Sequence, residues 1–123
     1  MSKKMLYPVI YLEKKNFDEN LKLKNMPTRV VLIMIQADYC GYCTQCKPDF
    51  ENFAQECLNN NYDITVATIQ TDDEENNMED IGRKINDSEG VPSFIIYIDG
   101  KKIKKHTGAR TKDAFLKFYQ DNI

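Results

Sequence analysis

The stretch Val30–Ile35 constrains the fold more than any other part of this sequence, because all of its residues are apolar. A strand with one face in water alternates apolar and polar residues, whereas a continuously apolar strand is covered on both faces. We therefore expect a central strand over Arg29–Gln36, in a sheet with helices on both sides. Apolar residues at helical spacing follow over 43–58 and predict an amphipathic helix after that strand.

The rest of the chain alternates between strand and helix patterns. The other expected elements are a strand Tyr7–Leu12, a helix Asn16–Lys24 with Asn16 as its N-cap, a strand Ile64–Gln70, a short helix marked by Met78, Ile81 and Ile85, strands Phe94–Ile98 and Lys101–Lys105, and a last helix capped by Thr111 with Phe115, Phe118 and Tyr119 inward. Because the Asp99-Gly100 turn predicts an antiparallel hairpin, the sheet should be mixed. The sequence predicts an α/β fold for one domain, residues 1–123, with a mixed central β-sheet flanked by helices on both faces.

The composition of the chain limits the classes of function that it can have. The chain has 123 residues, enough for one hydrophobic core, and its formal net charge of −2 gives no electrostatic case for a nucleic-acid partner. No apolar stretch approaches the roughly 20 residues of a membrane helix, and Met1–Leu12 lacks the pattern of a secretory signal. We therefore expect a soluble protein in a reducing, cytoplasmic compartment. The abundance of Lys, Asn and Ile fits an AT-rich genome, which makes a virion a further location if the source is a large DNA virus.

Two cysteines flank Gly41 and Tyr42 at the junction of the central strand and the following helix. A Cys-X-X-Cys motif in an α/β pattern indicates thiol–disulfide chemistry. Cys40 would lie at the helix N-terminus, where free backbone N–H groups and the helix dipole favour a thiolate. Cys43, one turn later, can reach back to form a reversible disulfide. We expect Cys40 to be exposed at this turn, with Tyr39 and Tyr42 partly exposed beside it.

With these features the chain resembles the thioredoxin family over nearly its whole length. The resemblance is carried by the segment around the two cysteines, a proline five residues after the second cysteine, a downstream Val-Pro-Ser, the final hairpin turn and a late glycine. In this order the matching residues are Ala37–Cys43, Pro48, Val91–Ser93, Asp99-Gly100 and Gly108. The resemblance implies a thioredoxin fold and a thiol–disulfide oxidoreductase that most simply reduces protein disulfides.

The family also implies a role for individual residues. Cys40 would attack the substrate disulfide, and Cys43 would resolve the mixed disulfide and release reduced substrate. Pro92 would follow a cis peptide bond and face the cysteine pair, while the backbone of Val91 would pair with the substrate chain. Residues shaping the site would be Tyr39, Gly41, Tyr42, Val91 and Pro92. The expected partners are disulfide-containing proteins and an electron donor, either a reductase or a low-molecular-weight thiol. We expect no organic cofactor, no metal, no nucleic acid, no membrane partner and a monomer.

The sequence departs from the family pattern beneath the cysteine pair. The family usually has a buried acid six residues before the first cysteine, where this chain has Met34, and the lysine often paired with that acid aligns with Thr68. Tyr39 replaces the usual tryptophan, and Gly-Tyr between the cysteines is similar to bacterial disulfide isomerases. Without the acid, we expect a slower resolving step and a more stable Cys40 thiolate, hence a less reducing potential than that of ordinary thioredoxin.

Several alternatives stay open from the sequence alone. The pair could serve an oxidase or isomerase, or the domain could be a binding module whose cysteines contact a partner or a metal, with Cys46 and His106 as further ligands. Cys46 is either a core residue or a third redox thiol, and Cys57 is expected in the core. His106 is expected on the surface at the far end of the last hairpin rather than in a Cys–His hydrolase site. The charged segments Asp72–Glu75 and Lys101–Lys105 are solvated surface or partner-docking sites.

Overall fold

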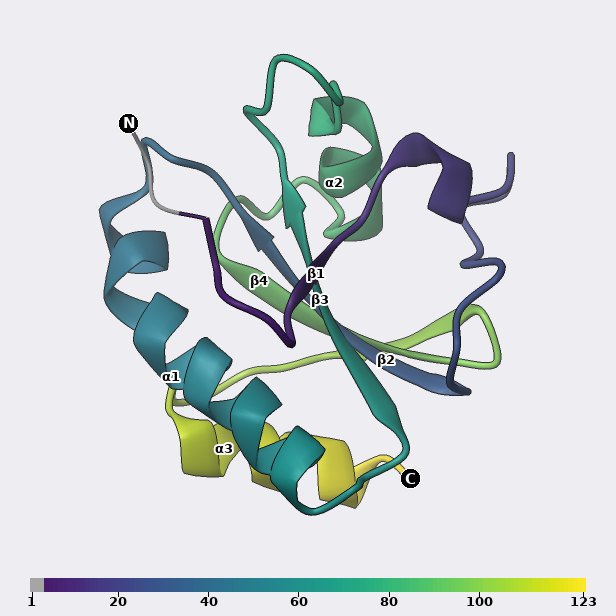
Figure 1. Ribbon diagram of the computed structural model, residues 1–123. Coiled ribbons are helices and arrows are strands. Elements are labelled where there is room, and N and C mark those ends of the chain that lie inside the picture. Colours follow the sequence, from purple (N-terminus) through teal and green to yellow (C-terminus); the bar gives the residue numbers. More distant parts are fainter. Residues whose placement is uncertain (1–3) are drawn as a thin grey trace.

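A five-stranded mixed sheet with helices on both faces forms the framework of the computed structural model, which describes residues 4–123 (Figure 1). The spatial strand order is β1-β3-β2-β4-β5. The first three strands in this order are mutually parallel, and β4 and β5 are antiparallel to β2 and β4 respectively. The elements are β1 (Ile10–Tyr11), η1 (Lys14–Asn16), β2 (Val30–Gln36), α1 (Gly41–Asn59), β3 (Ile64–Gln70), α2 (Glu79–Ile85), β4 (Ser93–Ile98), β5 (Lys101–Lys105) and α3 (Lys112–Asp121). This architecture confirms the predicted α/β class.

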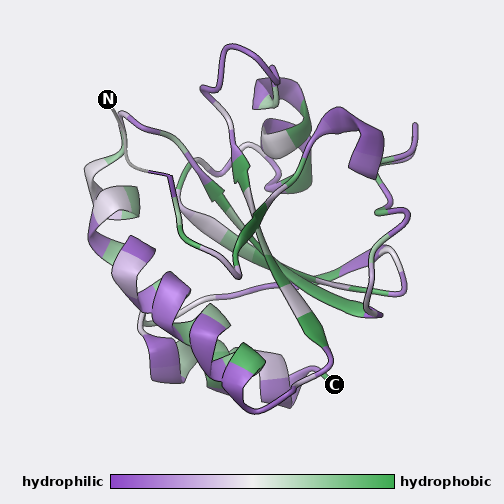
Figure 2. Ribbon diagram, viewed as in Figure 1, coloured by the Kyte–Doolittle hydropathy of each residue, from purple (hydrophilic) through white to green (hydrophobic). Residues whose placement is uncertain are grey.

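The central strand β2 is buried along its whole length, as its apolar sequence predicts. Side chains from even-numbered positions such as Leu32 pack in the core cluster shared with α1 and α3, and those from odd-numbered positions such as Ile33 pack in the cluster on the α2 side. Figure 2 shows the strands mostly in hydrophobic colour, whereas the helices mix hydrophobic and hydrophilic residues. The sheet therefore separates two cores, and the cysteine pair belongs to the one under α1.

Helix α1 confirms the predicted helix of residues 43–58 and extends it slightly at both ends. Cys40 is its N-cap, and Asn60 is its C-cap. The helix continues through Pro48 without a break in its assignment. Since proline has no N–H, the carbonyl of Thr44 lacks the backbone hydrogen bond that position 48 would otherwise supply.

The final hairpin and helix also follow the predictions. Asp99 and Gly100 have positive φ angles of 52° and 82°, as a two-residue hairpin turn of this hand requires. A Cβ on Gly100 would approach the Leu23 carbonyl oxygen to 2.7 Å, so the site needs glycine for space as well as conformation. The Thr111 hydroxyl accepts a hydrogen bond from the N–H of Ala114 at 3.2 Å and caps α3.

The predicted helix over Asn16–Lys24 is wrong. A short 3-10 turn precedes Phe17, which then forms an isolated antiparallel bridge with Leu23. The Asp18 carboxylate accepts hydrogen bonds from the backbone N–H groups of Asn20 and Lys22, at 2.8 and 2.9 Å. These bonds close a tight loop from Asp18 to Lys22. An aspartate that binds nearby backbone groups in this way competes with helix formation. Phe17 and Leu23 are both buried, which explains the apolar spacing that resembled a helix.

The predicted first strand Tyr7–Leu12 is shorter in the structure, where only Ile10 and Tyr11 pair with β3. Pro8 interrupts the segment because it has no N–H to donate to a neighbouring strand. The first three residues of the segment Met1–Leu12, considered above for a secretory signal, lie outside the described residues. Within residues 4–123 no helix combines the length and the hydropathy that crossing a bilayer would require.

Candidate active site

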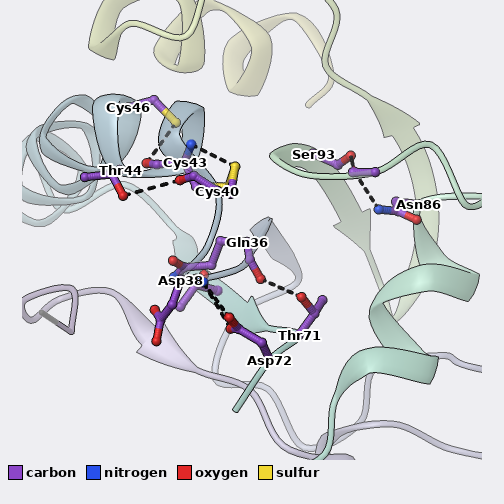
Figure 3. Close-up of a disulfide and its surroundings, with 12 residues drawn as sticks. Gln36, Asp38, Cys40, Cys43, Thr44, Cys46, Thr71, Asp72, Asn86 and Ser93 are labelled. Atoms are coloured by element: carbon purple, nitrogen blue, oxygen red, sulfur yellow. Dashed lines mark hydrogen bonds between the residues drawn. A yellow bond between two sulfur atoms is a disulfide. The ribbon is translucent and has the colours of Figure 1, made fainter. Parts of the chain in front are cut away.

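Cys40 and Cys43 form a disulfide at the N-terminus of α1, with their Cα atoms 5.2 Å apart (Figure 3). Cys40 has extended backbone angles as the N-cap, and its Sγ accepts a hydrogen bond from the N–H of Cys43 at 3.0 Å. Because Cys40 lies just outside the helix, the two-residue spacing is bridged without unwinding the first turn. The same N–H group and the helix dipole would stabilise a thiolate on Cys40 after reduction.

The two cysteines differ in exposure, although less than the sequence suggested. Cys40 is 8% exposed and Cys43 is fully buried at 0%. The expectation that Cys40 is exposed was therefore wrong: the cysteine packs into the core cluster under α1 and presents only a small part of its surface. Attack from outside still has one route, through Cys40, because Cys43 presents no surface to a substrate.

Two tyrosines next to the disulfide project into solvent, as predicted. Tyr39 is 79% exposed and Tyr42 is 67% exposed. The guanidinium of Arg110, from the loop before α3, lies 5.8 Å from the centre of the Tyr42 ring, within the range of a cation–π contact. Gly41 between them has open space where a side chain would lie. The disulfide is thus flanked by aromatic surface, with a cation beside Tyr42.

The loop of Val91 and Pro92 comes next to the cysteine turn through the register of the sheet. Ile35 of β2 pairs with Ser93 of β4, so Pro92 lies beside the residues that follow β2. The Val91–Pro92 bond is cis, as predicted. A pocket of about 200 Å³ is lined by both Tyr39 and Val91. The structure therefore brings the predicted site residues of the two loops to one end of the sheet.

Polar anchors that the sequence analysis missed hold both loops. The Asp72 carboxylate accepts from the backbone N–H of Asp38 at 3.0 and 2.9 Å and fixes the turn between β2 and α1 (Figure 3). In the second loop the Gly90 carbonyl accepts from the side chains of Asn86 and Ser93 at 2.8 and 2.7 Å. In the sequence, each of these residues is only a polar residue close to the end of a helix or strand. Such residues are too common for this feature to identify an anchor of the site.

The two positions where the sequence departs from the family pattern, Met34 and Thr68, belong to a buried polar network. Met34 and Thr68 are paired across β2 and β3 and are fully buried. The Thr68 hydroxyl donates to the Met34 carbonyl at 2.8 Å and accepts from the Gln36 side-chain amide at 2.9 Å. Among the described residues, Gln36 Oε1 is the one buried side-chain oxygen or nitrogen without a hydrogen-bond partner. No carboxylate is part of this network.

The network yields a stability prediction. Replacing Thr68→Val removes the hydroxyl and leaves the whole Gln36 amide unpaired in the core, which we expect to lower the free energy of unfolding by about 1–3 kcal/mol. Urea denaturation at neutral pH measures the change. The matched control is Thr65→Val on the same strand, whose hydroxyl pairs with partly exposed Thr28 and should matter less. Equal losses for the two variants would contradict the role given to Thr68.

The two remaining cysteines are free and buried. Cys46 lies one turn after Cys43 on the same buried side of α1, and burial raises the pKa of its thiol, partly offset by the charge of Arg110. Burial raises the pKa of Cys57 to about 12. Cys57 lies in the core, as predicted, and Cys46, for which a core position and a third redox role were both open, is buried as well.

The differences among these thiols predict an order of reactivity in the reduced protein. We expect iodoacetamide at neutral pH to modify Cys40 first and Cys57 last, because the first is a helix N-cap and the second is buried with a raised pKa. Mass spectrometry of samples quenched at successive times would give the order. Modification of Cys57 before Cys40 in folded protein would show that the site is not arranged as described.

His106 does not lie free on the surface, as the sequence analysis expected. Its ring is half-buried and packs edge-on against Phe94, Phe115 and Phe118, with centroid distances of 6.2, 5.6 and 5.0 Å. Its Nε2 lies 2.7 Å from the Ala109 carbonyl oxygen. Across residues 4–123, no three His, Cys, Asp or Glu side chains gather into a possible metal-binding group. His106 is therefore part of the aromatic packing under α3.

Comparison with known proteins settles the family. Residues 8–121 match the sequence profile of the thioredoxin family. The chain belongs to the thioredoxin family. It is 32% identical over 111 residues to the thioredoxin-like protein 453L of Invertebrate iridescent virus 6, covering 79% of this chain and 80% of that protein.

Longer relatives contain the same domain as one part. Protein disulfide-isomerase of Saccharomyces cerevisiae is 29% identical over 116 residues, which cover 93% of this chain but only 20% of the relative. Among solved structures, a mutant thioredoxin from Halobacterium salinarum superposes with a TM-score of 0.66 at 23% identity, covering 91% of this chain and 88% of the other. With its Cys-X-X-Cys disulfide, this thioredoxin-family chain is a protein-disulfide oxidoreductase.

Proposed function

We propose that the protein reduces disulfides in protein substrates, using Cys40 as the nucleophile and Cys43 as the resolving thiol. The observation that carries the proposal is the position of Cys40, which is the N-cap of α1 and the residue of the pair that keeps some exposed surface. A thiolate at this position is favoured by the helix N-terminus. Residues 1–123 act in this proposal as one thioredoxin-like domain.

The reaction consists of two exchanges. The Cys40 thiolate attacks one sulfur of the substrate disulfide, forms a mixed disulfide and releases the other substrate sulfur as a thiolate. Cys43 then attacks Cys40 Sγ, forms the disulfide seen in the structure and releases the second substrate thiolate. The proton of Cys43 passes to a departing substrate thiolate. The oxidised pair returns to the dithiol when a thiol donor gives two electrons.

The surface around Cys40 supports binding of an extended protein segment. Tyr39 and Tyr42 offer exposed aromatic surface, and Gly41 between them leaves room for a substrate backbone. The backbone of Val91, ahead of Pro92, would pair with the substrate chain. The partners in this proposal are disulfide-containing proteins and a reductase or low-molecular-weight thiol, and the protein acts as a monomer in a reducing compartment.

A second candidate function is disulfide isomerisation, and it rests on the missing acid beneath the pair. Met34 is fully buried in the same core cluster as Cys40 and Cys43, and its uncharged side chain neither opposes a Cys40 thiolate nor helps Cys43 to lose its proton. A stable thiolate and slow resolution lengthen the life of the mixed disulfide. Such a lifetime favours rearrangement of substrate disulfides over their net reduction.

The two functions separate in a paired assay. We expect the protein, with dithiothreitol as electron donor, to reduce the interchain disulfides of insulin faster than it reactivates ribonuclease A with scrambled disulfides in a glutathione buffer. The double variant Cys40→Ser/Cys43→Ser is the control for both reactions. Reactivation without insulin reduction would favour the isomerase, and no turnover in either assay would overturn the proposal.

A further inference from the structure

Cys46 is a third thiol, one turn beyond Cys43 on α1 (Figure 3). It is 4% exposed, and its Sγ donates a hydrogen bond to the carbonyl oxygen of Cys43 at 3.5 Å. Cys40, Cys43 and Cys46 all belong to the core cluster under α1. The first two turns of the helix therefore carry three sulfurs on the same buried side, each three residues from the next.

We propose that Cys46 is a third redox residue, which takes over the disulfide from Cys40 by attacking the sulfur of Cys43. The Cys40–Cys43 bond breaks, a Cys43–Cys46 bond forms, and the proton of the Cys46 thiol ends on the Cys40 sulfur. The number of disulfides does not change, so the step needs no external oxidant or reductant. The inference rests on the proposed thiol–disulfide function and adds a second oxidised form to it.

The geometry of the helix start shows how the second form is reached. Residues three apart within a helix have Cβ atoms about 5–6 Å apart, whereas a disulfide requires about 3.8 Å. The Cys40–Cys43 bridge meets this requirement because Cys40 is the N-cap, with φ −88° and ψ 108°. A Cys43–Cys46 bridge therefore requires Cys43 to become the N-cap, with α1 beginning at Thr44 instead of Gly41.

The first turn of α1 is suited to this shift. Starting the helix at Thr44 breaks only the hydrogen bonds that the carbonyls of residues 40–42 accept, among them the one from the Thr44 N–H to the Cys40 carbonyl at 3.2 Å. Pro48 supplies no N–H to the carbonyl of Thr44, so the turn that contains Cys46 is held to the rest of the helix by fewer backbone hydrogen bonds. The Cys40–Cys43 form is the one in the structure, and the second form is minor because it requires the first turn of α1 to open.

The second form changes what Cys40 can do. While Cys43 is bonded to Cys46, Cys40 is a free thiol in the segment ahead of the shortened helix and can still attack a substrate disulfide. No resolving thiol is then available, so the mixed disulfide is released by another thiol of the substrate itself. That outcome rearranges a substrate disulfide without reducing it, which gives the isomerase candidate a specific structural basis.

Trapping the second disulfide tests the inference. In the Cys40→Ser variant, oxidised in a glutathione buffer, we expect most molecules to contain a Cys43–Cys46 disulfide, located by fragmentation of the alkylated peptide. The matched controls are Cys40→Ser/Cys46→Ser, which should form no internal disulfide, and Cys40→Ser/Cys57→Ser, which should form it as before. Cys57 lies fourteen residues beyond Cys43, roughly 21 Å along the helix, so it cannot substitute for Cys46.

A second measurement uses the unaltered protein and avoids any folding defect of the variant. Oxidised protein is exposed to iodoacetamide under native conditions, and we expect a minor fraction with Cys40 alkylated and Cys43 bonded to Cys46. The inference is overturned if Cys40→Ser gives only glutathione adducts or free thiols and the oxidised native protein never shows alkylated Cys40. Insulin reduction by the same native preparation distinguishes this failure from a failure of the proposed function.

Discussion

Replacing Cys40→Ser should lower the rate of insulin reduction by about a thousandfold or more, because a serine hydroxyl is not ionised at neutral pH and cannot form the mixed disulfide. The fold should persist, since serine is a good helix N-cap and can still accept from the N–H of Cys43. The rate is measured with dithiothreitol as donor, and far-UV circular dichroism checks the fold.

Replacing Cys43→Ser provides the matched comparison. Cys40 can still attack in this variant, but the resolving thiol is gone, so a covalent adduct of protein and substrate should accumulate. Non-reducing electrophoresis would show the adduct, which dithiothreitol should dissolve. If Cys43→Ser gave no adduct while Cys40→Ser did, the roles of the two cysteines would be reversed, and the accessibility argument would be wrong.

Introducing an acid under the site by Met34→Asp should have the second large effect. Met34 is fully buried, so the new carboxyl group loses solvation and its pKa should rise by up to 3–5 units. A raised pKa in the folded state favours folding less as pH rises, so the variant should be most stable in acid. At neutral pH we expect a loss of about 2–5 kcal/mol from the free energy of unfolding.

The same variant should change the chemistry of the pair. A carboxylate there would help Cys43 to lose its proton and would oppose a thiolate on Cys40, so we expect faster release of substrate from the mixed disulfide and a more reducing pair. Met34→Leu is the control and should cost less than about 1.5 kcal/mol with no change in chemistry. Stopped-flow kinetics would measure the rate of the resolving step in both variants. Equal rates for the aspartate and leucine variants would show that the residue at position 34 does not influence the cysteine pair.

The sequence predicted the sheet and the redox pair because both depend on strong local patterns. The apolar run at Val30–Ile35 is typical of a strand covered on both faces, and the spacing of Cys40 and Cys43 after it favours thiol–disulfide chemistry. The predictions failed where a single polar side chain decides the backbone path. Asp18 binds the N–H groups of its own loop and turns the segment before Leu23 away from a helix.

The supports of the site could not be predicted, because they depend on contacts between distant segments. Nothing in the sequence joins Asp72 to the N–H of Asp38, which lies 34 residues earlier. Gln36 and Thr68 each look like an ordinary polar residue in an apolar strand, and their hydrogen bond follows only from the register of β2 and β3. The burial of Cys40 likewise required the packing of the core under α1.

The reduction potential of the Cys40–Cys43 pair tests the central claim most directly. It is measured by equilibrating the protein in glutathione buffers and quantifying trapped thiols. The account predicts a value between about −270 and −200 mV, that of a reductant less strong than ordinary thioredoxin, and a value above about −180 mV would instead indicate an oxidant or isomerase. If no disulfide formed between Cys40 and Cys43 at any glutathione ratio, the redox function itself would be contradicted.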